Sequence, residues 1–231
     1  MNHGVFVTGT DTGCGKTRVS VALIEQLRAR GIRVGGFKPV AAGSERHDRE
    51  LRNDDALALI AASGLDVPYR AANPYCFEPA IAPHLAAAEA GIKIEAGPIL
   101  AARDELASGC EFLVVEGAGG WRVPLGPRFD MQGLALELGL PVLLVVGLRL
   151  GCLNHALLSE QSILAGGARL LGWIGSQVDP GMARLNENIA TLNTRLSRPC
   201  LGILPHPGSD KTLTRAAPLE IEYLVREAVR A

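Results

Sequence analysis

The sequence predicts an α/β protein with a doubly wound, mainly parallel sheet and helices on both faces. Three observations support this fold class. Short aliphatic runs alternate with helical patterns along most of the 231 residues. A glycine-rich turn joins the first apolar run to the first helical pattern. Aromatic residues make up only 4% of a chain that is 48% hydrophobic, which suits helices packed on both faces of an aliphatic sheet.

The strands and helices are expected to alternate. Near-continuous apolar runs, typical of strands buried on both faces, predict strands at 4–8, 34–38, 112–116, 142–147, 171–178 and 201–204. Helices are predicted at 16–30, 53–63, 97–108, 154–165, 182–196 and 218–230. Residues 73–77 are a candidate for a further strand, and residues 41–83 otherwise lack clear strands. We expect one domain over 1–231, with its site at the carboxyl ends of the strands and 41–83 surrounding it.

Composition and charge exclude several classes of protein. The net charge is −1 and the basic residues are scattered, so nucleic acid is not an expected partner. No apolar stretch approaches the roughly 20 residues that a membrane span requires, and no apolar signal segment precedes the first strand. The five cysteines include no C-x-x-C pair, which argues against a disulfide framework or a thiolate metal site. We expect a cytoplasmic protein without a membrane partner.

The glycine-rich turn, residues 9–17, indicates a phosphate-binding loop of the P-loop NTPase type. Glycines let several backbone N–H groups point at one anion, and the following helix adds its positive dipole end. Lys16 is expected to reach the terminal phosphates of a nucleotide, and the Thr17 hydroxyl to hold Mg²⁺. The loop is a variant, because Gly9 stands one residue too far from Gly15-Lys16-Thr17 for the usual spacing.

Cys14 within this loop has two interpretations. A thiol near a helix N-terminus can have a lowered pKa and be reactive, in which case alkylation would block nucleotide binding. The plainer interpretation is that Cys14 fills a slot for a small residue, and without an identified basic partner this second interpretation is favoured.

Three charged residues follow predicted strands or begin a helix near the loop. Glu116 ends an apolar run, resembles the carboxylate of a Walker B strand and is followed by the glycine-rich segment 117–120. Lys38 precedes a proline, which holds it in an extended backbone beside the same crevice. Asp55 begins a helix, where an acidic residue is usually a partner of the helix dipole and only sometimes a metal ligand.

Taken in order, the motifs resemble the dethiobiotin synthetase family. They are Gly9-Thr10-Asp11-Thr12 with Gly15-Lys16-Thr17, then Lys38-Pro39-Val40, Asn53 to Leu59, Asn73-Pro74-Tyr75, Pro83-His84, Glu116 to Trp121, and Leu150-Gly151-Cys152-Leu153-Asn154-His155-Ala156. The resemblance runs from residue 4 to about residue 205. It implies an ATP-dependent enzyme that joins CO₂ and 7,8-diaminononanoate into the cyclic urea dethiobiotin, through a carbamate and a carbamic-phosphoric anhydride.

The resemblance also implies residue roles. Lys16, Lys38 and Thr12 would be catalytic, and Mg²⁺ would be held by Thr17, Asp55 and Glu116. ATP would be bound by Gly13, Cys14, Gly15, Lys16, Thr17, Arg18, Asp55, Glu116, Gly117, Ala118, Gly119, Gln177 and Pro205. The diamine would be bound by Lys38 and Ala42, and its distant carboxylate by Gly151, Cys152, Leu153 and Asn154 of a neighbouring subunit in a homodimer. Without the resemblance, that last element reads as a strand-to-helix turn capped by Asn154.

The sequence departs from the family's pattern at three places. Gly13 stands where some relatives have Glu, and Ala42 where relatives commonly have a serine that touches the substrate. Ser176-Gln177 replaces an Asn-Asp pair associated with the adenine. A Gln amide can still offer a donor and an acceptor to a purine, so we expect ATP to be used but nucleotide selectivity to be relaxed.

Two other functions compete with this one. A cobyrinate diamide synthase-like enzyme shares the superfamily, but such enzymes usually carry a fused glutamine-hydrolysing domain. A switch ATPase of the partitioning or cell-division type acts by binding membrane or DNA; its loop has a signature lysine where this chain has Asp11. The segment 218–230 mixes Glu220, Glu222 and Glu227 with its basic residues, which is unlike a basic membrane-binding helix.

Overall fold

The computed structural model describes residues 3–48, 50–208 and 217–230. Its centre is a sheet in which every neighbouring pair of strands is parallel. The six strands lie in the order β12-β11-β10-β1-β7-β2. Their bounds are β1 His3–Gly9, β2 Val34–Phe37, β7 Phe112–Glu116, β10 Val142–Leu148, β11 Leu170–Gln177 and β12 Cys200–Leu204. The predicted fold class is confirmed, and all six predicted core strands occur.

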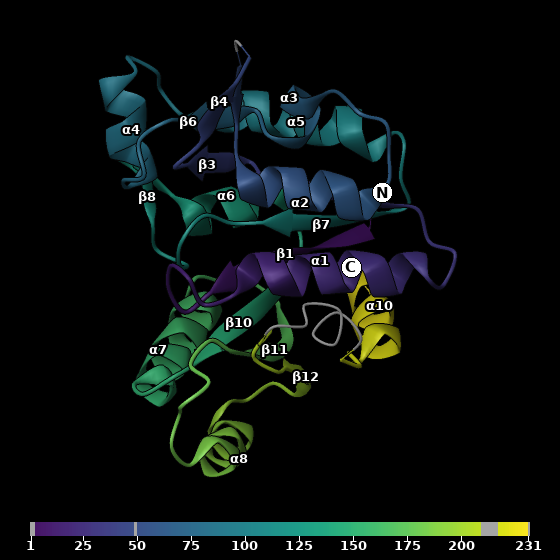
Figure 1. Ribbon diagram of the computed structural model, residues 1–231, viewed down its shortest axis with the longest axis vertical. Coiled ribbons are helices and arrows are strands. Elements are labelled where there is room, and N and C mark those ends of the chain that lie inside the picture. The colour runs from purple at the N-terminus through teal and green to yellow at the C-terminus, as the bar shows by residue number, and fades with distance from the viewer. Residues whose placement is uncertain (1–2, 49, 209–216, 231) are drawn as a thin grey trace.

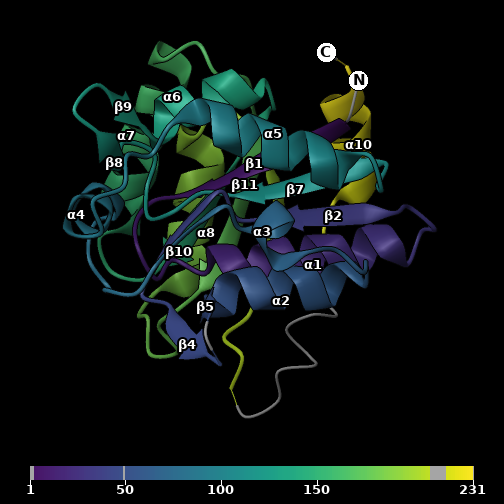
Figure 2. The same ribbon diagram turned by 90° about the horizontal axis from the view of Figure 1, so that it is seen from above.

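Helices cover both faces of this sheet, because each strand turns alternate side chains to opposite faces. Phe6 packs into one hydrophobic cluster, whereas its neighbours Val5 and Val7 pack into the other. One face is covered by α1 Lys16–Arg28, α2 Asp54–Ser63 and α10 Ile221–Val229. The opposite face is covered by α5 Ala96–Ala107, α6 Met131–Leu138 and α7 Cys152–Ala165. Two further helices of this cluster lie farther out: α8 Leu185–Arg195 packs against α7, and α4 Pro83–Glu89 packs against residues 40–42. Figure 2 shows α1 and α2 on one side of β1, β7 and β2, with α5 on the other.

The prediction that residues 41–83 lack strands is wrong. Two small sheets lie there: β3 Val40–Ala42 pairs in parallel with β6 Tyr75–Phe77, and β4 Glu45–His47 pairs antiparallel with β5 Glu50–Arg52. Helix α4 packs against β3 and β6, which lie near it in Figure 1, and β5 contacts β6, whereas the short helix α3 Tyr69–Ala72 packs against α5 and β2. The candidate strand at 73–77 therefore exists, but outside the central sheet. Strands of three residues are too short to show an alternating pattern in sequence.

Other differences concern short elements and helix ends. Helices α3, α4 and α6 and the hairpin of β8 Pro124–Gly126 with β9 Phe129–Asp130 were not predicted. Helix α8 begins three residues later than predicted, because Arg184 before it adopts a left-handed backbone with φ +55°. Helix α7 begins two residues earlier, at Cys152. None of the described helices is long and apolar enough to cross a membrane.

Candidate active site

The phosphate-binding loop lies between the end of β1 and the start of α1, and its glycines are required by geometry. Gly15 is the N-cap of α1 and has φ +95°. A Cβ atom on Gly15 would lie 2.1 Å from Ser176 Oγ, and one on Gly9 would lie 2.3 Å from Cys14 Sγ. Because glycine has no side chain to cap α1, the first N–H groups of the helix remain available to an anion.

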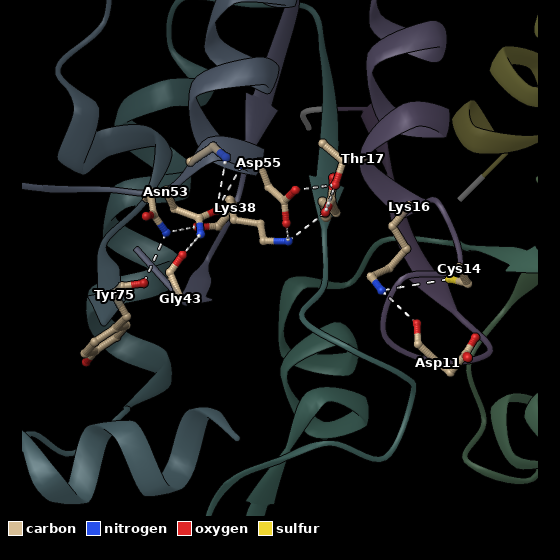
Figure 3. A network of polar contacts seen from close by, with 12 residues as sticks. Asp11, Cys14, Lys16, Thr17, Lys38, Gly43, Asn53, Asp55 and Tyr75 are labelled. Atoms are coloured by element: carbon tan, nitrogen blue, oxygen red, sulfur yellow. Dashed lines mark hydrogen bonds and ion pairs between the residues drawn. The ribbon is translucent and has the colours of Figure 1, made fainter. Parts of the chain in front are cut away.

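Lys16 is buried in this loop and carries an ammonium group without a carboxylate partner among the described residues. Its Nζ donates to the Asp11 carbonyl oxygen at 3.1 Å and lies 3.9 Å from Cys14 Sγ. Figure 3 shows the Lys16 side chain turned toward Asp11 and Cys14, apart from the second lysine. A cation held only by neutral acceptors keeps its charge available for the phosphates of a nucleotide.

Lys38 directly follows β2 and forms the charged centre of the site. Its Nζ lies 2.6 Å from Glu116 Oε1, at the end of β7, and 2.9 Å from Asp55 Oδ2, in the first turn of α2. Lys38 is 4% exposed and Glu116 is fully buried. Burial alone would lower the pKa of Lys38, but the carboxylates of Glu116 and Asp55 outweigh it and raise that pKa. Burial would raise the pKa of Asp55, but Lys38 and Thr17 hold it below its usual value.

The oxygen atoms around Thr17 fit a divalent cation. Thr17 Oγ1 lies 2.6 Å from Asp55 Oδ1 and 3.0 Å from Glu116 Oε1, although a hydroxyl has only one proton to donate. Glu116 Oε2 is buried without a hydrogen-bond partner in the described structure. Among the described residues, no three His, Cys, Asp or Glu side chains form a metal-binding cluster. Two carboxylates and one hydroxyl match Mg²⁺, which takes few protein ligands and completes its shell with phosphate and water.

A buried hydrogen-bond network that sequence reasoning missed holds Lys38 and Asp55 in place. Asn73 Nδ2 donates to the Lys38 carbonyl oxygen at 2.6 Å, and its Oδ1 accepts from the Tyr69 hydroxyl at 2.8 Å. The same hydroxyl accepts from the backbone N–H of Asn53, the residue that caps α2. The motif Asn73-Pro74-Tyr75 pointed to this region but not to this role, and nothing in the sequence singled out Tyr69.

A cavity of about 690 Å³ joins most of the predicted site residues. Its volume is within the usual range for a small-molecule site. Ala80 to Pro83 and Asn53 also line it, so the segment 41–83 does surround the site. The predicted residues in its lining are Thr12, Gly13, Gly15, Lys16, Thr17, Arg18, Lys38, Ala42, Asp55, Glu116, Ala118 and Gly119.

Two predicted nucleotide-binding residues lie below the cavity surface. Cys14 is fully buried, and burial raises the pKa of its thiol although the nearby Lys16 ammonium opposes that rise, which favours the space-filling interpretation over the reactive one. Gly117 faces the core, where a Cβ would lie 3.1 Å from the Phe6 ring. In both cases a small residue is needed for packing beneath the loop.

Gln177 and Pro205 lie beside the cavity, joined to it by Arg18. The Arg18 guanidinium donates to Ser176 Oγ at 3.2 Å, to the Gln177 carbonyl at 3.3 Å and to the Pro205 carbonyl at 2.5 Å. The sequence grouped these residues only through the family resemblance. The structure brings them together because β11 and β12 are adjacent strands that end at the same edge.

The segment Gly151 to Asn154 lies outside the cavity of its own chain. Gly151, with φ +96°, is the N-cap of α7, so the alternative interpretation of Asn154 as the cap is wrong. Asn154 is the third residue of the helix and is exposed, and Leu150 before it is 95% exposed. An ion pair between Arg149 and Asp11 ties this turn to the phosphate-binding loop.

The chain has a phosphate-binding loop between β1 and α1 of a parallel sheet, and oxygen atoms that suit Mg²⁺ lie beside that loop. These features define a P-loop nucleotide-binding protein. Solved structures share this fold. The receptor FtsY from Elizabethkingia anophelis, solved with GDP, aligns with TM-score 0.52 at 15% identity, covering 97% of this chain and 63% of that one. The MinC:MinD cell division complex from Aquifex aeolicus aligns with TM-score 0.56 at 14% identity, covering 99% and 95%. At these identities the likeness shows the fold alone.

Sequence comparison gives the family. The model of the AAA domain family matches residues 3–210. An ATP-dependent dethiobiotin synthetase, BioD, from Pseudomonas paraeruginosa is 50% identical over 220 residues, which cover 95% of this chain and 96% of the relative. The protein of the same name from Aromatoleum aromaticum is 48% identical over 213 residues, covering 92% and 95%. The chain belongs to the dethiobiotin synthetase family, as an ATP-dependent ligase of biotin biosynthesis, and not to either competing class.

Proposed function

We propose that this chain closes the cyclic urea of dethiobiotin from 7,8-diaminononanoate, CO₂ and ATP, releasing ADP and phosphate. One amine takes up CO₂ as a carbamate. A carbamate oxygen attacks the γ-phosphorus of ATP, and ADP leaves. The second amine then attacks the carbonyl of the carbamic-phosphoric anhydride, and phosphate leaves. The observation that supports this most is the placement of Lys38, Glu116 and Asp55 in one cavity with Lys16 and Thr17.

The residues of the cavity would act by positioning and by stabilising charge, which is most of what phosphoryl transfer asks of a protein. Lys16 would neutralise the terminal phosphates and Lys38 the carbamate, with Thr12 close by on the loop. Thr17, Asp55 and Glu116 would hold Mg²⁺, which when bound offsets the negative charge of the phosphates. Ala42 has no hydroxyl, so it would shape the diamine end of the cavity by contact alone.

One incubation tests this function. The protein is mixed with ATP, Mg²⁺, diaminononanoate and ¹³C-bicarbonate, and the products are identified by mass spectrometry. A cyclic urea that carries the label, formed together with ADP only when the diamine is present, is the expected result. ADP formed at the same rate without diamine, and no labelled urea, would show that the chain is an ATPase of another kind.

We also propose a homodimer in which Gly151 to Asn154 of one subunit binds the distant carboxylate of the diamine held by the other. The start of α7, with no side chain capping it, suits an anion. Gly151→Val should disable this turn, because valine is strained at φ +96°.

Mixing equal amounts of the Gly151→Val and Lys16→Ala variants, each inactive alone, should then restore about a quarter of the normal activity. Half of the dimers would be hybrids, and each hybrid would carry one intact shared site out of two. If mixtures stay inactive while hybrid dimers form, each site lies within one chain.

A further inference from the structure

Arg18 is the third residue of α1, yet its side chain reaches the carboxyl ends of β11 and β12, the two strands farthest from β2 in the sheet. It lines the cavity with Lys16 and Thr17. Its guanidinium donates to one hydroxyl and two carbonyl oxygens, those of Ser176, Gln177 and Pro205, at the ends of β11 and β12. A guanidinium carries five N–H bonds. Two are left over here: the one at Nε, which is buried without a partner in the described structure, and the second one at Nη2, whose other hydrogen goes to the Pro205 carbonyl.

The order of the strands shows which end of a nucleotide faces Arg18. Lys38, Glu116 and Asp55 come from β2, β7 and α2, on one side of β1. The terminal phosphates belong on this side, where the cation and the magnesium-type oxygens lie. The partners of Arg18 come from β11 and β12, on the other side of β1. A nucleotide laid across the loop therefore directs its base toward Arg18; this step rests on the proposed use of ATP.

The polar groups beside Arg18 are nearly all engaged within the protein. Ser176 Oγ and the carbonyl oxygens of Gln177 and Pro205 already accept hydrogen bonds from the guanidinium. The Gln177 side chain is held too: its Oε1 accepts from the backbone N–H of His206 at 3.2 Å, and its Nε2 donates to the Asp179 carbonyl at 3.5 Å. Each of these oxygens has two lone pairs and has already given one of them to a protein donor. An incoming base thus finds the second Nη2 N–H of Arg18 and acceptors that are only half available. A 6-amino purine needs an acceptor at that position, whereas a 6-keto purine needs a donor.

We propose that Arg18 sets the base selectivity of this enzyme. It occupies the oxygen atoms that would otherwise accept a hydrogen bond from a 6-amino group, and it offers an N–H donor to a 6-keto group. The relaxed selectivity expected from Ser176-Gln177 then has a direction. With Arg18 present, hypoxanthine and guanine nucleotides bind about as well as adenine nucleotides. Without Arg18, the freed carbonyl oxygens favour adenine.

Binding of ADP and IDP tests this most sharply, because the two bases differ chiefly in the amino or keto group at position 6. Isothermal titration with each diphosphate and Mg²⁺ gives the ratio of dissociation constants. The wild type should bind IDP within about threefold of ADP. Arg18→Met, which keeps the apolar stem, should shift that ratio about tenfold toward ADP, the discrimination expected of one unmatched hydrogen bond.

Arg28→Met is the matched control. Arg28 ends the same helix and also donates to a backbone carbonyl, that of Ala62 at 2.6 Å, but lies outside the cavity. Its ADP to IDP ratio should equal that of the wild type. If the ratio of ADP to IDP affinity shifts equally in both arginine variants, Arg18 only stabilises α1, and the proposal is overturned.

Two further results would overturn it: a wild type that prefers ADP by more than about tenfold, or an Arg18→Met variant with an unchanged ratio. If Arg18→Met does not fold, the wild-type ratio still decides, and Arg18→Lys, which keeps the charge with fewer donors, should give an intermediate ratio. These measurements need no turnover. A chain that binds both diphosphates as expected but forms no dethiobiotin would refute the proposed function and leave the role of Arg18 standing.

Discussion

The two ends of the cleft, which we propose hold the phosphates and the base of the nucleotide, are built from different chemistry. At the phosphate end, a buried lysine lies between two carboxylates, and the side chains themselves are the working groups. At the base end, an arginine mainly contacts backbone carbonyl oxygens, and Pro205 is exposed to solvent. A buried charge tolerates almost no substitution, because its partner cannot be solvated instead. A backbone acceptor is present whatever the side chain. The phosphate end should therefore be sensitive to mutation, and the base end should tune selectivity at small cost.

The largest effect should follow from Lys38→Met. Loss of the ammonium leaves Glu116 buried without its partner, so turnover should fall about 10³-fold or more. The free energy of unfolding without Mg²⁺ should fall by about 3–5 kcal/mol. Steady-state kinetics and urea unfolding measure the two effects. Lys93→Met, at an exposed ion pair with Glu95, is the control and should change stability by less than about 1 kcal/mol. Equal destabilisation by both variants would contradict the contrast between the ends.

The pH dependence of stability should show the same buried cluster. The pKa of Asp55 is held below 3.8, so its stabilisation is present above that pH and is lost as pH falls through the lower, folded value. The pKa of Lys38 is raised above 10.5, so its stabilisation is present below that pH and is lost as pH rises toward the folded value. Urea unfolding across pH should give a plateau between these limits. An alkaline decline that persists unchanged in Lys38→Met would show that other groups cause it.

A moderate effect is expected from Tyr69→Phe. The ring stays beneath the Arg52 guanidinium, but the hydroxyl that joins Asn53 and Asn73 is lost. Lys38 and Asp55 would then be held less firmly, and we expect turnover to fall about tenfold with a loss of about 1–2 kcal/mol in stability. Tyr75→Phe, at a hydroxyl exposed near Lys93, is the matched control. If its turnover falls equally, the effect is not specific to the buried network.

A small effect is expected from Ser176→Ala at the base end. Arg18 keeps both of its carbonyl acceptors, so the affinity for Mg²⁺-ADP should stay within about threefold of the wild type. Calorimetric titration measures it. A loss of affinity as large as that in Lys16→Ala would show that the base end depends on its side chains as strictly as the phosphate end does.

The smallest effect concerns Cys14 beneath the loop between the two ends. Because Cys14 is fully buried and its pKa is raised, iodoacetamide should leave it unmodified while the chain is folded, with or without ATP. Mass spectrometry of native and urea-unfolded samples gives the two rates. Rapid modification of the folded protein that ATP prevents would show instead that Cys14 is a reactive thiol.

Some of the missed elements left signals in the sequence. Asp130 caps α6 through a hydrogen bond to the Gly133 N–H, and Gly139 ends that helix, which is the usual pattern of helix start and stop residues. Pro83 at the first position of α4 is another such signal. The pairing of β3 with β6 could not be predicted, because Val40 and Tyr75 meet only after the chain between them has folded.

The sequence by itself determined the fold class, the phosphate-binding loop and the family. Those features follow from local patterns: buried strands must be apolar along their whole length, and a tight anion-binding turn must have glycines at fixed spacings. The tertiary structure alone decided which predicted residues meet. It joined Lys38, Asp55 and Glu116 through three separate elements, gave Tyr69 and Asn73 a role, and buried Cys14 and Gly117. Distances between side chains far apart in sequence depend on how strands and helices pack, and no local pattern records them.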